Sequence, residues 1–190
     1  MNATTDRTGG ATAGGLLLGV GLGGFVDGIV LHQILQWHHL LTDQRAPGRF
    51  PPGTVDDLEA NSLWDGIFHA GTWAVTVIGV VLLWRALRQG ARLDPRPFVG
   101  LLLLGWGMFN VVEGVVDHHL LSIHHVRDDV ADPRWWDLAF LAFGAALVAA
   151  GAALSRREPA ARPGLYGEPH HPGAANGHRT VRRMAERPLP

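Results

Sequence analysis

The sequence predicts an all-α integral membrane protein, a four-helix bundle made of two duplicated transmembrane hairpins. The 190-residue chain has an apolar fraction of 47% and a charged fraction of 17%, whereas soluble domains usually carry about 25% charged residues. Four long apolar stretches occur, roughly at 13–41, 62–84, 98–125 and 135–155. Each is long enough to cross the ~30 Å hydrocarbon layer as a helix, the form in which a single segment satisfies its own backbone hydrogen bonds.

The segments outside these spans predict the orientation of the chain. Of the 16 basic residues, all arginines, twelve lie in residues 1–12, in the loop between the second and third spans, or in residues 156–190. The positive-inside rule therefore predicts cytoplasmic termini, with loops 42–60 and 126–134 facing outward. Residues 156–190 are rich in Arg, Pro and Gly without periodicity, so we expect a disordered cytoplasmic tail.

Composition also excludes several classes of function. The chain has no cysteine, which excludes a disulfide framework, a thiolate metal site and a thiol nucleophile. Its formal net charge of −1 argues against a nucleic-acid partner, because phosphate binding needs a basic surface. The partner that the composition does predict is the lipid bilayer, with a homo-oligomer or another membrane protein as further possibilities.

An internal repeat relates the first span to the third. The segment DGIVLHQILQWHH, beginning at Asp27, aligns without gaps with EGVVDHHLLSIHH, beginning at Glu113, at an offset of 86 residues. The second helices match more weakly, since Trp64-Asp65 resembles Trp136-Asp137 but His69 falls on Leu141. We interpret this pattern as a duplicated hairpin, whose halves are related by an axis along the membrane normal.

Polar side chains gather on the inward faces of these helices. On ideal helices the histidines of spans one and three share a broad face with small residues, and span two adds a polar stripe at spacings of three and four. We expect the cluster in the outer half of the membrane, with His32 and His118 about 10 Å deeper than His39 and His125. The predicted metal ligands are His32, His39, Asp65, His69, His118 and His125. The predicted alternative ligands, or residues orienting the ligands, are Asp27, His38, Asn61, Asn110, Glu113, Asp117 and His124.

Ionisable groups inside a membrane usually mark function. Imidazole and carboxylate together suit zinc, iron or copper(II), and Asp65 or Glu113 is the candidate general base. Two alternatives stay open: His32 and His118 could ligate one haem iron, or the cluster could be a buried hydrogen-bond network without metal. His119 is predicted to face away from the cluster.

The stretches GFVDGIVLHQILQWHH, NSLWDGIFHAGTW and FNVVEGVVDHHLLSIHHVRD resemble a bacterial family of small membrane proteins called domain of unknown function 2243. The similarity covers roughly residues 12–155. It implies a four-helix protein of the bacterial inner membrane and brings no activity with it.

Two classes of function follow for such a cluster. The first is a metal-dependent membrane enzyme or a redox-related protein. The alternative is a non-catalytic accessory or assembly factor, for a respiratory complex or for metal handling. Transport is less favoured, because the cytoplasmic halves of the helices offer no continuing polar path.

Overall fold

The computed structural model describes residues 3–42 and 54–156 of the chain. Helix α1 (Ala3–Phe25) continues into the π-helix η1 (Val26–Ile34), and α4 (Pro95–Glu113) continues into the π-helix η2 (Gly114–Leu120). The other two helices are α3 (Val55–Arg88) and α5 (Arg134–Ser155), and the described residues contain no strand. Four helical segments are long and apolar enough to cross a membrane, which confirms the predicted all-α class and its four spans. The tail prediction for 156–190 and the middle of loop 42–60 lie almost wholly outside the described residues.

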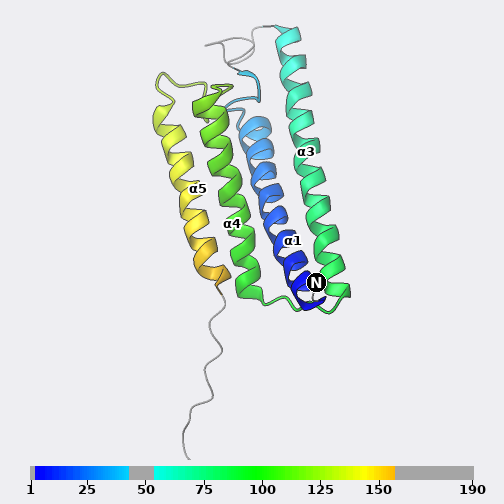
Figure 1. The fold of residues 1–190 in the computed structure, drawn as a ribbon. Coiled ribbons are helices and arrows are strands. Elements are labelled where there is room, and N and C mark those ends of the chain that lie inside the picture. The colour runs from blue at the N-terminus through cyan, green and yellow to red at the C-terminus, as the bar shows by residue number, and fades with distance from the viewer. Residues whose placement is uncertain (1–2, 43–53, 157–190) are drawn as a thin grey trace, which may run out of the picture. The chain divides into compact units, whose positions relative to one another are not determined.

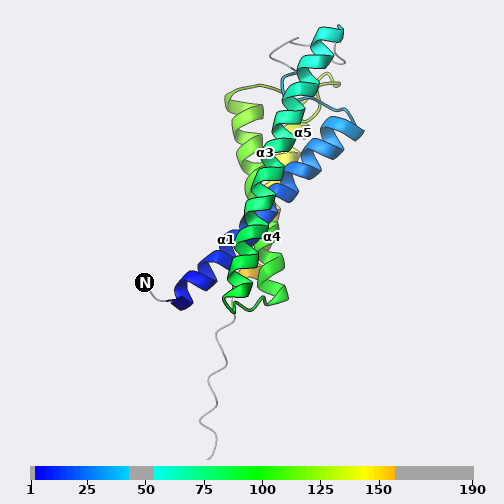
Figure 2. The ribbon, with the colours of Figure 1, turned by 90° about the vertical axis from the view of Figure 1, so that its right-hand side faces the viewer.

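The helices stand side by side in the order α3, α1, α4, α5 (Figure 1). Helix α1 packs on both α3 and α4, and α5 packs on α4. The two central helices are inclined to one another and cross (Figure 2). A Cβ atom placed on Gly105 would lie 3.0 Å from the Cα of Gly19, so glycine at both positions permits this close approach.

The outer helices contact the central ones through equivalent glycine pairs. A Cβ on Gly14 of α1 would lie 3.0 Å from the carbonyl oxygen of Gly79 in α3. A Cβ on Gly100 of α4 would lie 2.9 Å from the carbonyl oxygen of Gly151 in α5. Gly100 follows Gly14 by the same 86 residues as in the sequence repeat, so the two helix pairs use the same contact at the same register.

The distribution of polar and apolar side chains is the reverse of that in a soluble protein. Among the described residues the buried hydrophobic side chains are Ala86 and Val126, whereas the buried polar ones include four carboxylates and five histidines. Helix α3 exposes large apolar side chains such as Leu63, Ile67 and Trp73. Such surfaces suit contact with lipid, and they leave the polar interior as the feature that needs explanation.

The first and third spans end earlier than the sequence predicts. Leu35 N donates to Val30 O at 2.8 Å, and Leu121 N donates to Val116 O at 2.8 Å, the i to i−5 bonds of a π-turn. At the next residue the backbone is left-handed, with φ of 51° at Gln36 and 46° at Ser122. The expected helices to residues 41 and 125 are therefore wrong in their last turns, where the chain leaves the helix axis.

This turn changes the predicted depth of the histidines. His32 lies inside η1 and His39 beyond the turn, yet their Nδ1 atoms contact the two oxygens of the same carboxylate, Asp65, at 3.0 and 2.7 Å. The expected depth difference of about 10 Å between His32 and His39 is therefore wrong, because it assumed an unbroken helix rising 1.5 Å per residue. The turn instead brings both imidazoles to one level.

Candidate metal centre

Four imidazoles meet at the ends of the two central helices that carry η1 and η2. His32 belongs to η1 and His118 to η2, while His38 and His124 follow the left-handed turns. The rings of His38 and His124 stack at 4.4 Å with 6° between their planes. His32 lies 4.4 Å from His38 and His118 lies 4.9 Å from His124, as measured between ring centroids. All four residues are at most 3% exposed.

Carbonyl groups orient the two stacked rings. His38 Nδ1 donates to the carbonyl oxygen of Val126 at 2.9 Å, and His124 Nδ1 donates to that of Leu40 at 3.2 Å. Because a carbonyl only accepts, Nδ1 carries the proton and Nε2 carries a free lone pair. Each bond crosses from one helix pair to the other, so the stacked pair also fastens the two pairs together.

Carboxylates orient the other two rings. Asp65 of α3 lies 3.0 Å from His32 Nδ1, and Asp137 of α5 lies 3.5 Å from His118 Nδ1. A carboxylate behind an imidazole is the usual support of a metal-ligating histidine, since it fixes the ring and raises its basicity. Asp65 therefore holds His32 by a hydrogen bond, whereas His118 Nδ1 faces Asp137 without forming one.

Six atoms inside the cluster that could ligate a metal are buried and lack a hydrogen bond of good geometry. These are Nε2 of His32, His38, His118 and His124, Oδ2 of Asp27 and Oε2 of Glu113. His32 Nε2 lies 3.1 Å from Asp27 Oδ2, and His124 Nε2 lies 3.9 Å from Glu113 Oε1. A buried polar atom without a partner costs about 1–3 kcal/mol, so these atoms are the ones that a ligand could stabilise.

The same residues form three groups whose ligand atoms all lie within 4.8 Å of one another. The groups are His32 with His38 and His124, Glu113 with His118 and His124, and Asp27 with His32 and Glu113. Every member is buried. The structure thus brings together His32 and His118, which we expected as ligands, with four residues that we expected as alternatives.

Asp65 takes a supporting position rather than a place among these donors. Its two oxygens receive His32 Nδ1, His39 Nδ1, the backbone N–H of Leu40 at 2.9 Å and the amide of Gln33 at 3.1 Å. Four donors occupy most of the lone pairs of one carboxylate. The arrangement therefore assigns Asp65 to holding histidines.

Asp137 holds the equivalent position and was absent from our predicted site. It accepts from His125 Nδ1 at 2.7 Å and from the backbone N–H of Val126 at 2.9 Å. The resemblance of Trp136-Asp137 to Trp64-Asp65 was the available signal. We used it as support for the repeat and did not extend it to the site.

The remaining predicted residues lie around the cluster. His39 and His125 contact the supporting aspartates, and His69 Nδ1 donates to the carbonyl oxygen of Asp65 in its own helix at 2.6 Å. Buried Asn61, buried Asn110 and half-buried Asp117 belong to none of the three groups. His119 is exposed and its Nδ1 donates to Gly114 O at 2.7 Å, so it faces away as predicted.

Burial also keeps the stacked histidines beyond the spans in the ligand-competent form. Burial is the main reason that the pKa of His124 falls to about 4, and that of His38 falls well below its usual value. His124 lowers the pKa of His38 further, and His32 lowers that of His124, because adjacent imidazolium charges repel. Both are therefore neutral near pH 7, as metal binding requires.

An apolar cavity of about 340 Å³ lies beside the cluster. Its walls come from α1, η1, α4 and α5 and include Trp37, Trp106 and Trp136, while Asp27 and Asn110 supply polar groups. The guanidinium of Arg127 lies over the rings of Trp37 and Trp136, 4.9 and 4.8 Å from their centroids. Because Asp27 lines the cavity and also belongs to a ligand group, the cavity reaches the cluster.

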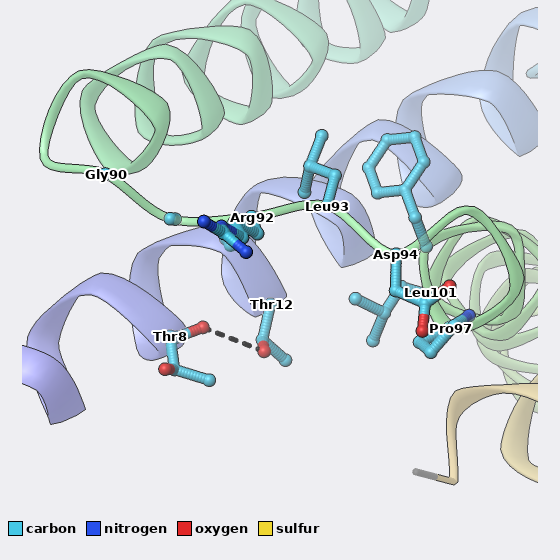
Figure 3. Close-up of a pocket in the computed structure, with 11 residues that line it drawn as sticks. Thr8, Thr12, Gly90, Arg92, Leu93, Asp94, Pro97 and Leu101 are labelled. Atoms are coloured by element: carbon cyan, nitrogen blue, oxygen red, sulfur yellow. Dashed lines mark hydrogen bonds between the residues drawn. The ribbon is translucent and has the colours of Figure 1, made fainter.

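A second cavity, of about 290 Å³, lies at the other end of the helices. Thr8 and Thr12 of α1 face the α3–α4 connection there, with the charged side chains of Arg92 and Asp94 (Figure 3). Thr12 Oγ1 donates to the carbonyl oxygen of Thr8 at 2.9 Å. Histidine does not line this cavity, so the metal-ligating chemistry of the described residues is confined to the opposite end.

Comparison with known families agrees with the architecture. The model of a family described as a predicted membrane protein, DUF2243, matches residues 14–158. The chain belongs to this family. The match includes all six donor residues of the cluster and both supporting aspartates. No curated protein and no solved structure matches the chain.

Proposed function

We propose that this membrane protein binds a metal through the cluster of four histidines, Asp27 and Glu113. The observation that carries the proposal is the set of six buried donor atoms without hydrogen-bond partners. A metal ion would bind these atoms. A buried polar atom that has no partner costs free energy. Nitrogen and oxygen donors without sulfur suit zinc, iron or copper(II).

The packing of the rings favours metal ions over haem. The centroids of neighbouring imidazoles lie 4.4 to 6.3 Å apart, so the rings themselves fill the space between η1 and η2. A porphyrin between His32 and His118 needs a flat gap wider than this. A metal-free network is the other alternative; in it His32 Nε2 pairs with Asp27 Oδ2 at 3.1 Å, whereas the Nε2 atoms of His38, His118 and His124 are left without a hydrogen-bond partner.

The placement of the protein follows from the arginine distribution. We propose that it spans a bacterial inner membrane with cytoplasmic termini, so that the cluster lies in the outer half. We also propose that the chain arose by duplication, because the contacts of His32, His38 and Gly14 recur 86 residues later. A cysteine introduced at Gly90 should resist an impermeant thiol reagent in intact cells, whereas one at Ala131 should react.

Elemental analysis of detergent-purified protein tests the metal site. Wild type prepared without chelator should contain stoichiometric metal, and His118→Ala should lose it wholly or partly. His119→Ala is the matched control, since the neighbouring imidazole is exposed and bonds only to the backbone in the described structure. If wild type binds no metal after incubation with zinc, iron(II) or copper(II), the proposal is wrong and the cluster is a metal-free hydrogen-bond network.

The apolar cavity favours a metal-dependent membrane enzyme or redox protein over an accessory factor. The tryptophan side chains that line the cavity suit a membrane-soluble aromatic substrate. Asp27 lies where the cavity meets the cluster, so a polar group of that substrate could reach the metal there. Neither predicted general base keeps that role in this proposal, because the oxygens of Asp65 are already occupied and Glu113 is assigned to the metal.

Cobalt(II) spectroscopy separates the two roles. Decyl-ubiquinol added to cobalt-loaded protein should shift its visible absorption, and Ala139→Trp, which fills the cavity, should abolish the shift while retaining the cobalt. An unchanged wild-type spectrum would favour a non-catalytic accessory or assembly role instead.

A further inference from the structure

We propose that the cluster holds two metal ions that share Glu113 as a ligand. The inference rests on the proposed function and specifies the form of its site. One ion would be held by Glu113, His118 and His124, and the other by Asp27, His32 and Glu113.

The internal symmetry carries the first step. Glu113, His118 and His124 form one of the groups whose ligand atoms lie within 4.8 Å of one another. Subtracting the 86-residue offset gives Asp27, His32 and His38. In that second set His32 Nε2 lies 3.1 Å from Asp27 Oδ2, and the rings of His32 and His38 lie 4.4 Å apart. Glu113 rather than His38 completes the group that contains Asp27 and His32, so the two groups share this carboxylate.

The distances between donors argue against one shared ion. Metal–ligand bonds of about 2.0–2.2 Å keep all ligand atoms of one ion within ~4.4 Å of each other. Among the described residues the six donors form three overlapping groups of three. His32, Glu113 and His124 each belong to two groups. This pattern is expected when two neighbouring ions share ligands.

The bridging role falls to Glu113. It belongs to two groups, with His118 and His124 in one and with Asp27 and His32 in the other. Two-metal enzymes hold their ions about 3.5–4 Å apart, a separation that one carboxylate with two oxygens can span.

Counting bound ions tests the inference separately from the proposed function. Full-length protein in detergent is stripped of metal, reloaded with excess cobalt(II), desalted, and analysed for cobalt per chain. Two ions per chain support the inference. One ion keeps the proposed metal site but overturns the binuclear centre, and none overturns both.

Matched variants locate the ions. His32→Ala and His118→Ala are symmetry equivalents, and each should bind at least one ion fewer than wild type, whereas His119→Ala should bind two. Two ions retained in both ligand variants would place the metal elsewhere and overturn the inference.

A spectroscopic measurement on wild type avoids dependence on variants that fail to fold. X-ray absorption of the reloaded protein should show a metal–metal vector of about 3.5–4 Å. Its absence at two ions per chain would show that the ions are not bridged.

Discussion

The first helix pair, α1–η1 with α3, and the second, α4–η2 with α5, share a scaffold and differ in what surrounds it. In both, a π-turn and a left-handed residue return a pair of histidines toward an aspartate on the neighbouring helix. The supporting contact is tighter in the first pair, where Asp65 lies 3.0 Å from His32, against 3.5 Å for Asp137 and His118. The two helix pairs therefore share the same turn and the same histidine positions, but their aspartates contact those histidines differently.

The difference extends to the side chains flanking each half. The first pair has His69 where the second has Leu141, and Trp37 where the second has Ile123. The first of these differences lies beside equivalent glycines of the two halves: His69 lies against Gly28, and Leu141 lies against Gly114. Corresponding residues of the two halves are therefore surrounded by different side chains.

The largest expected effect separates the two supporting aspartates. Asp65→Asn and Asp137→Asn each weaken the hold on the ligating imidazoles, and changes of this kind typically lower metal affinity by ~10- to 100-fold. The loss should be larger for Asp65, which accepts four donors, than for Asp137. Competition against a chelator of known affinity measures both, with Asp132→Asn as the control because that carboxylate is exposed and pairs with Arg134. Affinities equal to that control would remove the aspartates from the metal site.

The next test concerns what the halves share. In Gly19→Ala the new methyl would meet the Leu102 carbonyl, and in Gly105→Ala it would meet that of Leu16, so both overpack the crossing of α1 and α4. Overpacking of this kind costs about 1–3 kcal/mol. Thermal unfolding in detergent should show melting lowered by similar amounts in both variants, with Gly71→Ala unchanged because its Cβ would have open space. A large difference between Gly19 and Gly105 would contradict the equivalence of the two halves.

A smaller effect is expected where the halves differ in aromatic character. Trp37→Ile copies the second pair and removes a ring that lies 5.2 Å from Trp136 and 4.9 Å from the Arg127 guanidinium. An aromatic pair contributes about 0.5–1.5 kcal/mol beyond its buried area. Melting should fall by a few degrees, more than in Trp73→Ile, whose ring is exposed on α3. An equal fall in both variants would mean that the stacked group around Arg127 contributes nothing specific.

The sequence predicts the parts of this molecule that repeat and the parts that must be apolar. The four spans follow from length and hydropathy, and the equivalence of His32 with His118 follows from the ungapped register. A 3.6-residue period does not reveal a π-turn, nor the left-handed backbone at Gln36 and Ser122. His38 and His39 therefore do not lie on the helix face that we predicted for them, because the helix ends at Ile34.

Side-chain competition explains the other differences between prediction and structure. Asp65 and His69 share the polar face of α3, so spacing alone makes both candidate ligands. In the structure the nearby imidazole and backbone donors occupy the oxygens of Asp65, and the carbonyl of Asp65 takes Nδ1 of His69. Such local hydrogen bonds depend on three-dimensional positions that a helical projection leaves out.

The smallest expected effect belongs to His69, where the sequence predicted a ligand. His69→Leu gives the first helix pair the side chain that the second has at Leu141. The lost bond runs to a carbonyl of the same helix, and a typical intramolecular hydrogen bond contributes about 0.5–1.5 kcal/mol. His69 belongs to none of the three donor groups, so metal content after reloading should equal that of wild type, whereas His32→Leu should lose metal. If His69→Leu instead loses as much metal as His32→Leu, His69 is a ligand after all. The first helix pair would then hold its ion with a donor that the second lacks, and the equivalence of the two metal sites would fail at that residue.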